Sequence, residues 1–131
     1  MTQPARSAEQ ASAEDHIDVV APDGTRLAVY EWGNATGPAI LLVHGFAQCH
    51  LCFEPQYRSA LAKRFRLVAY DMRGHGASDQ PRDSAAYQGD RVWADDLAAV
   101  MAAKGLKGPV LVGWSMGGRV IRLRPMPASA P

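Results

Sequence analysis

The sequence predicts an α/β fold in which an N-terminal hairpin leads into a mostly parallel sheet flanked by helices. Two segments near the N-terminus alternate apolar and polar residues, which is typical of a hairpin with one buried face. Three later segments are continuous apolar runs, as expected of parallel strands covered on both faces. Segments with helical spacing lie between these runs, so the connections are expected to be right-handed crossovers.

The composition is that of one globular domain. The chain has 131 residues, of which 47% are hydrophobic, and this is enough for a single core. A formal net charge of +1 gives no electrostatic basis for binding nucleic acid. No apolar stretch approaches the ~20 residues that span a bilayer. We therefore expect neither a nucleic-acid partner nor a membrane partner.

Three regions are predicted along the chain. Residues 1–15 are too polar to bury surface and are expected to form a flexible tail. They lack the apolar region of a secretory signal, which predicts a cytoplasmic location. Residues 16–122 carry the periodic patterns and are expected to form a partial domain. Residues 123–131 contain three prolines and no pattern, and are predicted to be an irregular tail.

The first elements are predicted by alternation. Residues 16–20 and 26–32 alternate, and the Ala-Pro-Asp-Gly sequence between them supplies turn residues. After a loop, residues 39–43 form the first continuous apolar run. Phe53, Tyr57 and Leu61 then lie four apart, which predicts one helix.

The later elements are predicted from further continuous apolar runs, which indicate strands, and from helical spacing between them. Residues 66–71 form a second buried strand, and a polar loop continues to about residue 89. Apolar residues at positions 93, 97, 100 and 101 lie on one face of a helix that Gly105 can terminate. Residues 109–112 are the third buried strand.

A serine follows that third strand directly. Residues 113–118 read Gly-Trp-Ser-Met-Gly-Gly, a G-x-S-x-G turn between a strand and a helix. Such a turn projects the hydroxyl of Ser115 out of the sheet, and the helix behind it offers free N–H groups to a developing oxyanion. The alternative is a glycine-rich loop that contains a serine by chance, and the buried strand before it favours the first interpretation.

Three motifs in this order resemble the α/β-hydrolase family. They are Leu-Val-His-Gly-Phe at 42–46, Tyr-Asp-Met-Arg-Gly-His-Gly-Ala-Ser-Asp at 70–79, and the serine turn at 113–118. The residues in these motifs are most similar to those of the small-esterase and cofactor-free haloperoxidase branch of the family. The resemblance extends from about Ile17 to Arg122 and implies an incomplete α/β-hydrolase fold, cut after the nucleophile turn.

The resemblance implies a role for each motif residue. Ser115 corresponds to the nucleophile that attacks an ester or similar acyl carbon of a small substrate. The backbone N–H groups of Phe46 and Met116 correspond to the oxyanion hole. The remaining motif positions are expected to be structural, and they are His44, Gly45, Asp71, Gly74, His75, Gly76, Gly113 and Gly117.

The acid and base of the catalytic triad are missing from this sequence. In the family an Asp or Glu and then a His follow the nucleophile helix, whereas the 16 residues after Ser115 contain none of these. His44 and His75 are weak substitutes, because their motif positions shape loops. The sequence therefore predicts an N-terminal fragment that is inactive alone. The alternatives are one half of a split hydrolase, completed by a C-terminal half on another chain, or a non-enzymatic interaction module.

Neither a metal nor an organic cofactor is predicted. Cys49 and Cys52 form a C-x-x-C sequence, which is typical of redox or zinc sites in other contexts. No second cysteine pair is present, and nearby histidines complete no recognised ligand spacing. We expect two ordinary thiols in a reducing compartment.

Overall fold

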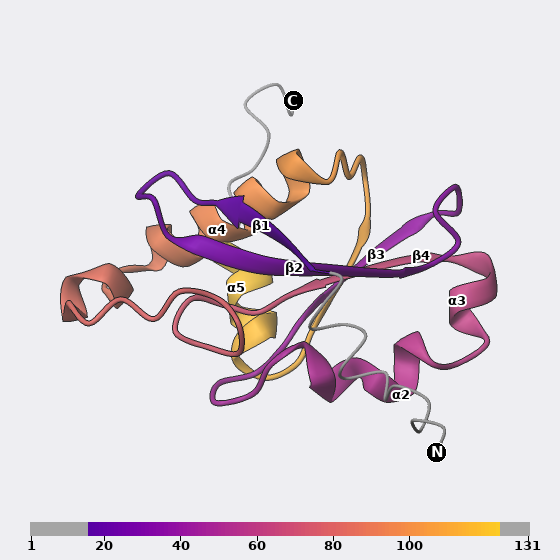
Figure 1. The fold of residues 1–131 in the computed structure, drawn as a ribbon, viewed down its shortest axis with the longest axis horizontal. Coiled ribbons are helices and arrows are strands. Elements are labelled where there is room, and N and C mark those ends of the chain that lie inside the picture. The colour runs from indigo at the N-terminus through magenta and orange to yellow at the C-terminus, as the bar shows by residue number, and fades with distance from the viewer. Residues whose placement is uncertain (1–15, 124–131) are drawn as a thin grey trace, which may run out of the picture.

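The computed structural model describes residues 16–123 as one mixed sheet with helices on both faces (Figure 1). The strand order is β1-β2-β4-β3-β5. The first two pairings, β1 with β2 and β2 with β4, are antiparallel, and β3 runs parallel to both β4 and β5. The strands are β1 (Ile17–Val20), β2 (Arg26–Gly33), β3 (Ala39–Val43), β4 (Arg66–Tyr70) and β5 (Val110–Gly113).

Helical segments separate into two groups, one on each face of the sheet. Helices α4 and α5 pack on one face over the larger hydrophobic core, and η1 and α2 contribute to the smaller core on the other face. The single-turn helix α3 follows α2 along the chain. The segments are η1 (His50–Phe53), α2 (Glu54–Tyr57), α3 (Leu61–Arg64), η2 (Ser84–Tyr87), α4 (Asp90–Ala103) and α5 (Met116–Leu123). No helix in residues 16–123 is both long and apolar enough to cross a membrane.

Helix α4 forms where the apolar periodicity predicts it. Leu97 and Val100 are fully buried on its inner face. The helix ends at Ala103, and Gly105, which was expected to terminate it, follows with a φ of 62°. The N–H of Leu106 donates to the carbonyl oxygen of Met101 at 2.9 Å and closes the last turn.

The single helix predicted from Phe53, Tyr57 and Leu61 is wrong. The segment is broken into η1, α2 and α3, and Leu61 is 40% exposed while the two aromatic side chains are buried. The break lies at Ser59, whose hydroxyl donates to the carbonyl oxygen of Gln56 and accepts from the N–H of Leu61. These local bonds compete with the helical ladder.

The remaining boundaries differ little from the prediction. Strand β4 ends one residue early, at Tyr70, and the predicted polar loop contains the short helix η2. Helix α5 includes Leu123, the first residue of the predicted C-terminal tail. The predicted N-terminal tail and the rest of the C-terminal tail lie outside the described residues.

Candidate active site

Ser115 lies on a sharp turn between β5 and α5. It has a φ of 55°, a left-handed conformation that few residues other than glycine adopt. Such a conformation costs on the order of 1–3 kcal/mol and persists only where the surroundings enforce it. The N–H of Trp114 donates to the carbonyl oxygen of Val43 at 3.0 Å, and the N–H of Gly117 donates to that of Trp114 at 2.9 Å. The turn therefore presents Ser115 to solvent.

The glycines of this turn allow two backbones to approach closely. A Cβ atom on Gly117 would lie 2.6 Å from the carbonyl oxygen of His44 and closer still to that of Val43. A Cβ atom on Gly113 would lie 2.5 Å from the carbonyl carbon of Gly117. A larger residue at position 117 would push α5 away from the end of β3, and one at position 113 would push α5 away from the end of β5. Either shift would move Ser115.

Two backbone N–H groups near this turn are free to bind an oxyanion. Met116 is the first residue of α5, so its N–H has no partner within the helix. Phe46 follows β3 in an exposed turn. Within residues 16–123, neither N–H donates a hydrogen bond. Both residues line the same cavity of about 390 Å³, which is within the size range of small-molecule sites.

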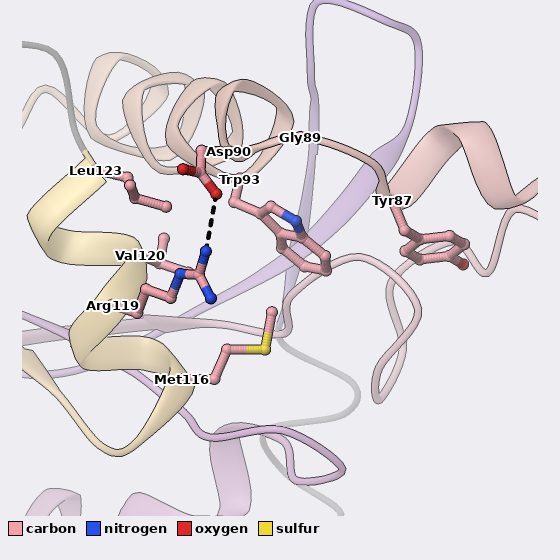
Figure 2. A pocket seen from close by; sticks show the side chains of 8 residues that line it. All are labelled: Tyr87, Gly89, Asp90, Trp93, Met116, Arg119, Val120 and Leu123. Carbon is pink, nitrogen blue, oxygen red and sulfur yellow. Dashed lines mark hydrogen bonds and ion pairs between the residues drawn. The ribbon is translucent and has the colours of Figure 1, made fainter.

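That cavity has a predominantly apolar and aromatic lining. Besides Phe46 and Met116, it contacts His75, Tyr87 and Trp93. A neighbouring hollow of about 320 Å³ lies between the first turn of α4 and the face of α5 that is directed toward α4 (Figure 2). Tyr87, Trp93 and Met116 line both the cavity and this hollow.

The neighbouring hollow carries the charged groups of this region. Arg119 Nη2 lies 3.2 Å from Asp90 Oδ1 across it, as Figure 2 shows. The region around Ser115 thus combines an apolar cavity with a charged rim.

His44 is held by the backbone on both sides of its ring. Its Nε2 accepts from the N–H of Met72 at 2.9 Å, so the proton is on Nδ1, which donates to the carbonyl oxygen of Gly45 at 2.7 Å. Burial lowers the pKa of His44 and favours this neutral form. No lone pair of the ring is left to accept a proton from Ser115.

His75 is engaged in the same way. Its Nε2 accepts from the N–H of Ala47 at 3.0 Å, and its Nδ1 donates to the carbonyl oxygen of Arg73 at 2.9 Å. The ring also lies edge-on to Phe46, with centroids 5.8 Å apart. His75 therefore positions the loop that carries the Phe46 N–H, and its lone pair is occupied.

Asp71 is the centre of a hydrogen-bond network behind the loops. Oδ1 accepts from the N–H and Nδ1–H of His50, at 2.8 and 2.9 Å. Oδ2 accepts from the hydroxyl of Tyr30 at 3.0 Å and from the N–H of Ala77 at 2.9 Å. Burial alone would raise the pKa of Asp71, but the hydrogen bonds from His50 and Ala77 outweigh it and lower the pKa.

The glycines of the same loops lie against these networks. A Cβ atom on Gly76, which has a φ of 51°, would overlap the Asp71 carboxylate. Gly74 lies against the ring of Tyr87, and Gly45 lies between Gln48 and Trp114. Gly45, Gly74 and Gly76 therefore lie where the backbone closely approaches another side chain.

Arg73 organises the second network, and sequence reasoning assigned it no role. Its side chain is 1% exposed and forms two 2.7 Å hydrogen bonds with Asp96. It also donates to Asp23 and to the carbonyl oxygen of Ala86, each at 2.7 Å. These bonds raise the pKa of Arg73 and lower that of Asp23. The arginine fastens the hairpin turn, η2 and α4 to the loop after β4.

Comparison with known proteins assigns the family. The model of the α/β hydrolase fold family matches residues 38–123, so the chain belongs to that family. It is 46% identical over 83 residues to the protein named "Probable oxidoreductase EphD" of Mycobacterium bovis, a match that covers 63% of this chain and 14% of that protein. It is 36% identical to a non-heme chloroperoxidase of Streptomyces lividans, over 76% of this chain and 35% of the relative.

Solved structures give the same assignment. The esterase RhEst1 from Rhodococcus sp. ECU1013 superposes with a TM-score of 0.76 and 41% identity, over 82% of this chain and 39% of the esterase. Esterase and haloperoxidase relatives confirm the resemblance seen in the motifs. The chain spans between 14% and 39% of the length of these three relatives. The five-stranded fold described here is therefore part of the fold that they contain.

Proposed function

We propose that this chain is the nucleophile-bearing portion of a serine hydrolase that acts on esters or related acyl substrates. The observation that carries the proposal is the geometry at Ser115. Ser115 is exposed on a left-handed turn, and the next residue, Met116, lines a cavity together with Phe46. The N–H groups of Phe46 and Met116 donate no hydrogen bond within residues 16–123. Each such donor is commonly worth about 3–4 kcal/mol to the transition state.

The chemistry begins with attack of Ser115 Oγ on the acyl carbon. The hydroxyl proton must pass to a base as the bond forms, and the two N–H groups stabilise the negative charge on the former carbonyl oxygen. The alcohol then leaves with a proton, and water releases the acyl group. A haloperoxidase-like variant would release it to peroxide instead.

We propose that the base comes from outside residues 16–123. His50 Nε2 has no partner among the described residues, but it is buried, whereas Ser115 is exposed. His44 and His75 use both ring nitrogens in loop hydrogen bonds, and Asp71 accepts four hydrogen bonds from other groups. We propose that the chain by itself is inactive for this reason. An acid and a histidine supplied by a further portion of the domain, on this or another polypeptide, would complete the triad.

The cavity favours an uncharged substrate group. Its aromatic lining would bury an apolar acyl or alkoxy group beside the oxyanion donors, and a charged group would lose hydration there without a paired partner. We therefore propose small esters with an apolar group as the substrate class.

The experiment joins residues 16–122 to the portion of the Rhodococcus esterase that follows the equivalent helix. The chimera is expected to hydrolyse p-nitrophenyl acetate. Ser115→Ala should lower the rate by at least about 1,000-fold, because the nucleophile is lost. The exposed Ser84→Ala is the matched control and should leave the rate unchanged. Hydrolysis that survives Ser115→Ala in a folded chimera would overturn the proposal.

A second candidate function is a non-enzymatic interaction module, and the exposed edge of β5 favours it. Val110 is 59% exposed and Val112 is 40% exposed, and within residues 16–123 β5 pairs only with β3. Such an edge can accept a further strand. Size-exclusion chromatography separates the two functions: a stable monomer favours the module, and a stoichiometric complex with a polypeptide that supplies the triad favours a split hydrolase.

A further inference from the structure

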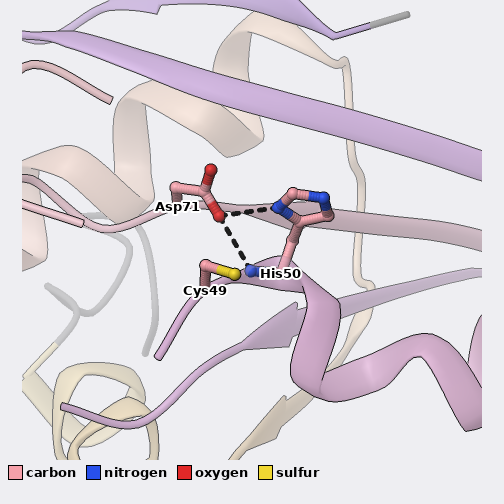
Figure 3. Close-up of side chains that lie close together, drawn as sticks. All are labelled: Cys49, His50 and Asp71. Atoms are coloured by element: carbon pink, nitrogen blue, oxygen red, sulfur yellow. Dashed lines mark hydrogen bonds and ion pairs between the residues drawn. The ribbon is translucent and has the colours of Figure 1, made fainter. Parts of the chain in front are cut away.

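The side chains of Cys49, His50 and Asp71 converge between the loop after β3 and the end of β4. A sulfur, an imidazole nitrogen and a carboxylate oxygen, one from each residue, all lie within 4.8 Å of one another. Figure 3 shows that His50 Nδ1 and Asp71 point toward each other, with the Cys49 sulfur beside the backbone N–H of His50. We propose that this cluster binds a zinc ion.

The donor set has the chemistry that zinc prefers. Thiolate, imidazole and carboxylate are the three common zinc ligands, with metal–ligand distances of about 2.0–2.3 Å. Ionised Cys49 and Asp71 together carry two negative charges, which balance the charge of the ion. Tetrahedral ligands lie about 3–4 Å apart at those distances, so small side-chain shifts bring the three atoms into range. A water molecule would take the fourth position.

Two of the three ligands are already held in place. The ring of His50 stacks on Tyr30, with centroids 3.6 Å apart and an interplanar angle of 18°. Tyr30 also donates to Asp71 Oδ2, as does the N–H of Ala77. A zinc ion on Oδ1 would leave both of these hydrogen bonds intact, so they would serve as the outer support that metal-binding carboxylates usually have.

The proton balance of binding is simple. Cys49 releases its thiol proton to solvent, and the proton on His50 Nδ1 is replaced by the ion and returns on Nε2. Within the described residues, Nε2 of His50 is buried and has no hydrogen-bond partner. The ion would replace the present Nδ1–H hydrogen bond to Asp71 Oδ1, and placing the proton on Nε2 displaces no other bond. In His44 and His75, by contrast, both ring nitrogens are engaged by other groups.

The position of the cluster suggests a structural effect. Cys49 is half-exposed, which gives the ion a route from solvent. The bound ion would tie the loop that carries Phe46 to the end of β4. In the sequence, the spacing of Cys49 and Cys52 was the pattern that resembled a metal site. The third ligand proposed here, Asp71, lies 21 residues beyond His50 and is brought near by the pairing of β3 with β4.

The test is titration of the full chain with Co²⁺ under reducing conditions, followed by displacement with Zn²⁺. A thiolate-to-cobalt absorption band that saturates at one equivalent is expected. Cys49→Ser should abolish the band, because a hydroxyl does not replace the thiolate. Cys52→Ser is the matched control and should retain it. Tyr30→Phe should weaken binding by about 10- to 100-fold, as loss of an outer-shell partner does.

The opposite results would overturn the proposal. Absence of the band in a chain that retains its circular dichroism spectrum would show that the cluster is only a hydrogen-bonded pair beside a thiol. Equal loss of the band in Cys49→Ser and Cys52→Ser would show binding by the C-x-x-C thiols of an unfolded segment.

Discussion

Strands β4 and β5 have similar sequences but very different surroundings. Both are short apolar runs that pair in parallel with β3. Val68 in β4 is fully buried, whereas Val110 in β5 is 59% exposed. An apolar run therefore predicts that a strand forms, but the neighbours on each side decide how much of it is buried.

The loops that follow β4 and β5 also differ in how deeply their polar side chains are buried. The loop after β4 begins with Asp71 and Arg73, which are buried and fully engaged in hydrogen bonds. The turn after β5 carries Ser115, which is exposed. The loop after β4 therefore buries its charged side chains, whereas the turn after β5 exposes the proposed nucleophile. The predictions below measure this contrast.

The largest effect is expected from Arg73→Leu. It leaves the carboxylate of Asp96 buried without its partner, and breaking such a pair costs about 3–5 kcal/mol. Arg119→Leu removes the exposed pair with Asp90 and should cost no more than about 1 kcal/mol. Urea denaturation of both variants measures the free energy of unfolding. Equal losses of unfolding free energy in the two variants would show that the buried Arg73–Asp96 pair contributes no more than the exposed Arg119–Asp90 pair.

The two valines allow a direct comparison of the strands. Val68→Ala should lower the free energy of unfolding by about 1.5–3 kcal/mol, because two fully buried methyl groups are lost. Val110→Ala should change it by less than about 0.5 kcal/mol, as is usual for exposed positions. A large loss for Val110→Ala would show that β5 is covered by a part of the protein beyond residues 16–123.

Substitution near Ser115 is expected to be destabilising at Gly117 and tolerated at the next residue, Gly118. Gly117→Ala should cost about 1–3 kcal/mol, because its Cβ would overlap the carbonyl oxygen of Val43. Gly118→Ala should be neutral or stabilising, since its Cβ would meet nothing closer than 3.6 Å. Thermal unfolding measures both, and equal melting temperatures would be the contrary result.

The smallest effect concerns pH. The pKa of Asp71 is lowered in the folded state, so its contribution to stability is present above its unfolded pKa, near 4. That contribution is lost as the pH falls through the folded pKa. Unfolding free energies measured from pH 6 to pH 2 should decline less steeply in Asp71→Asn than in the original chain. Identical slopes would show that Asp71 does not titrate with folding.

Much of the fold follows from local patterns in the sequence. The five strands, the helix that ends before Gly105 and the glycine turn at Ser115 were all predictable, because each depends on residues close in the chain. The break at Ser59 was not, because a hydroxyl competing with the helical ladder leaves no mark on apolar spacing. The roles of Arg73 and His50 were hidden for a different reason. Their partners lie 20 or more residues away and meet them only after the sheet has formed.

The proposal that Ser115 is a nucleophile without a base is tested most directly by a fluorophosphonate probe, which reacts with activated serines. Under the proposed function, Ser115 has two oxyanion donors but no base within residues 16–123, and an unactivated hydroxyl is a weak nucleophile at neutral pH. The chain alone should be labelled negligibly, and Ser115→Ala should leave that background unchanged. Rapid labelling that depends on Ser115 would contradict the account, because it would require a base within the 131-residue chain itself.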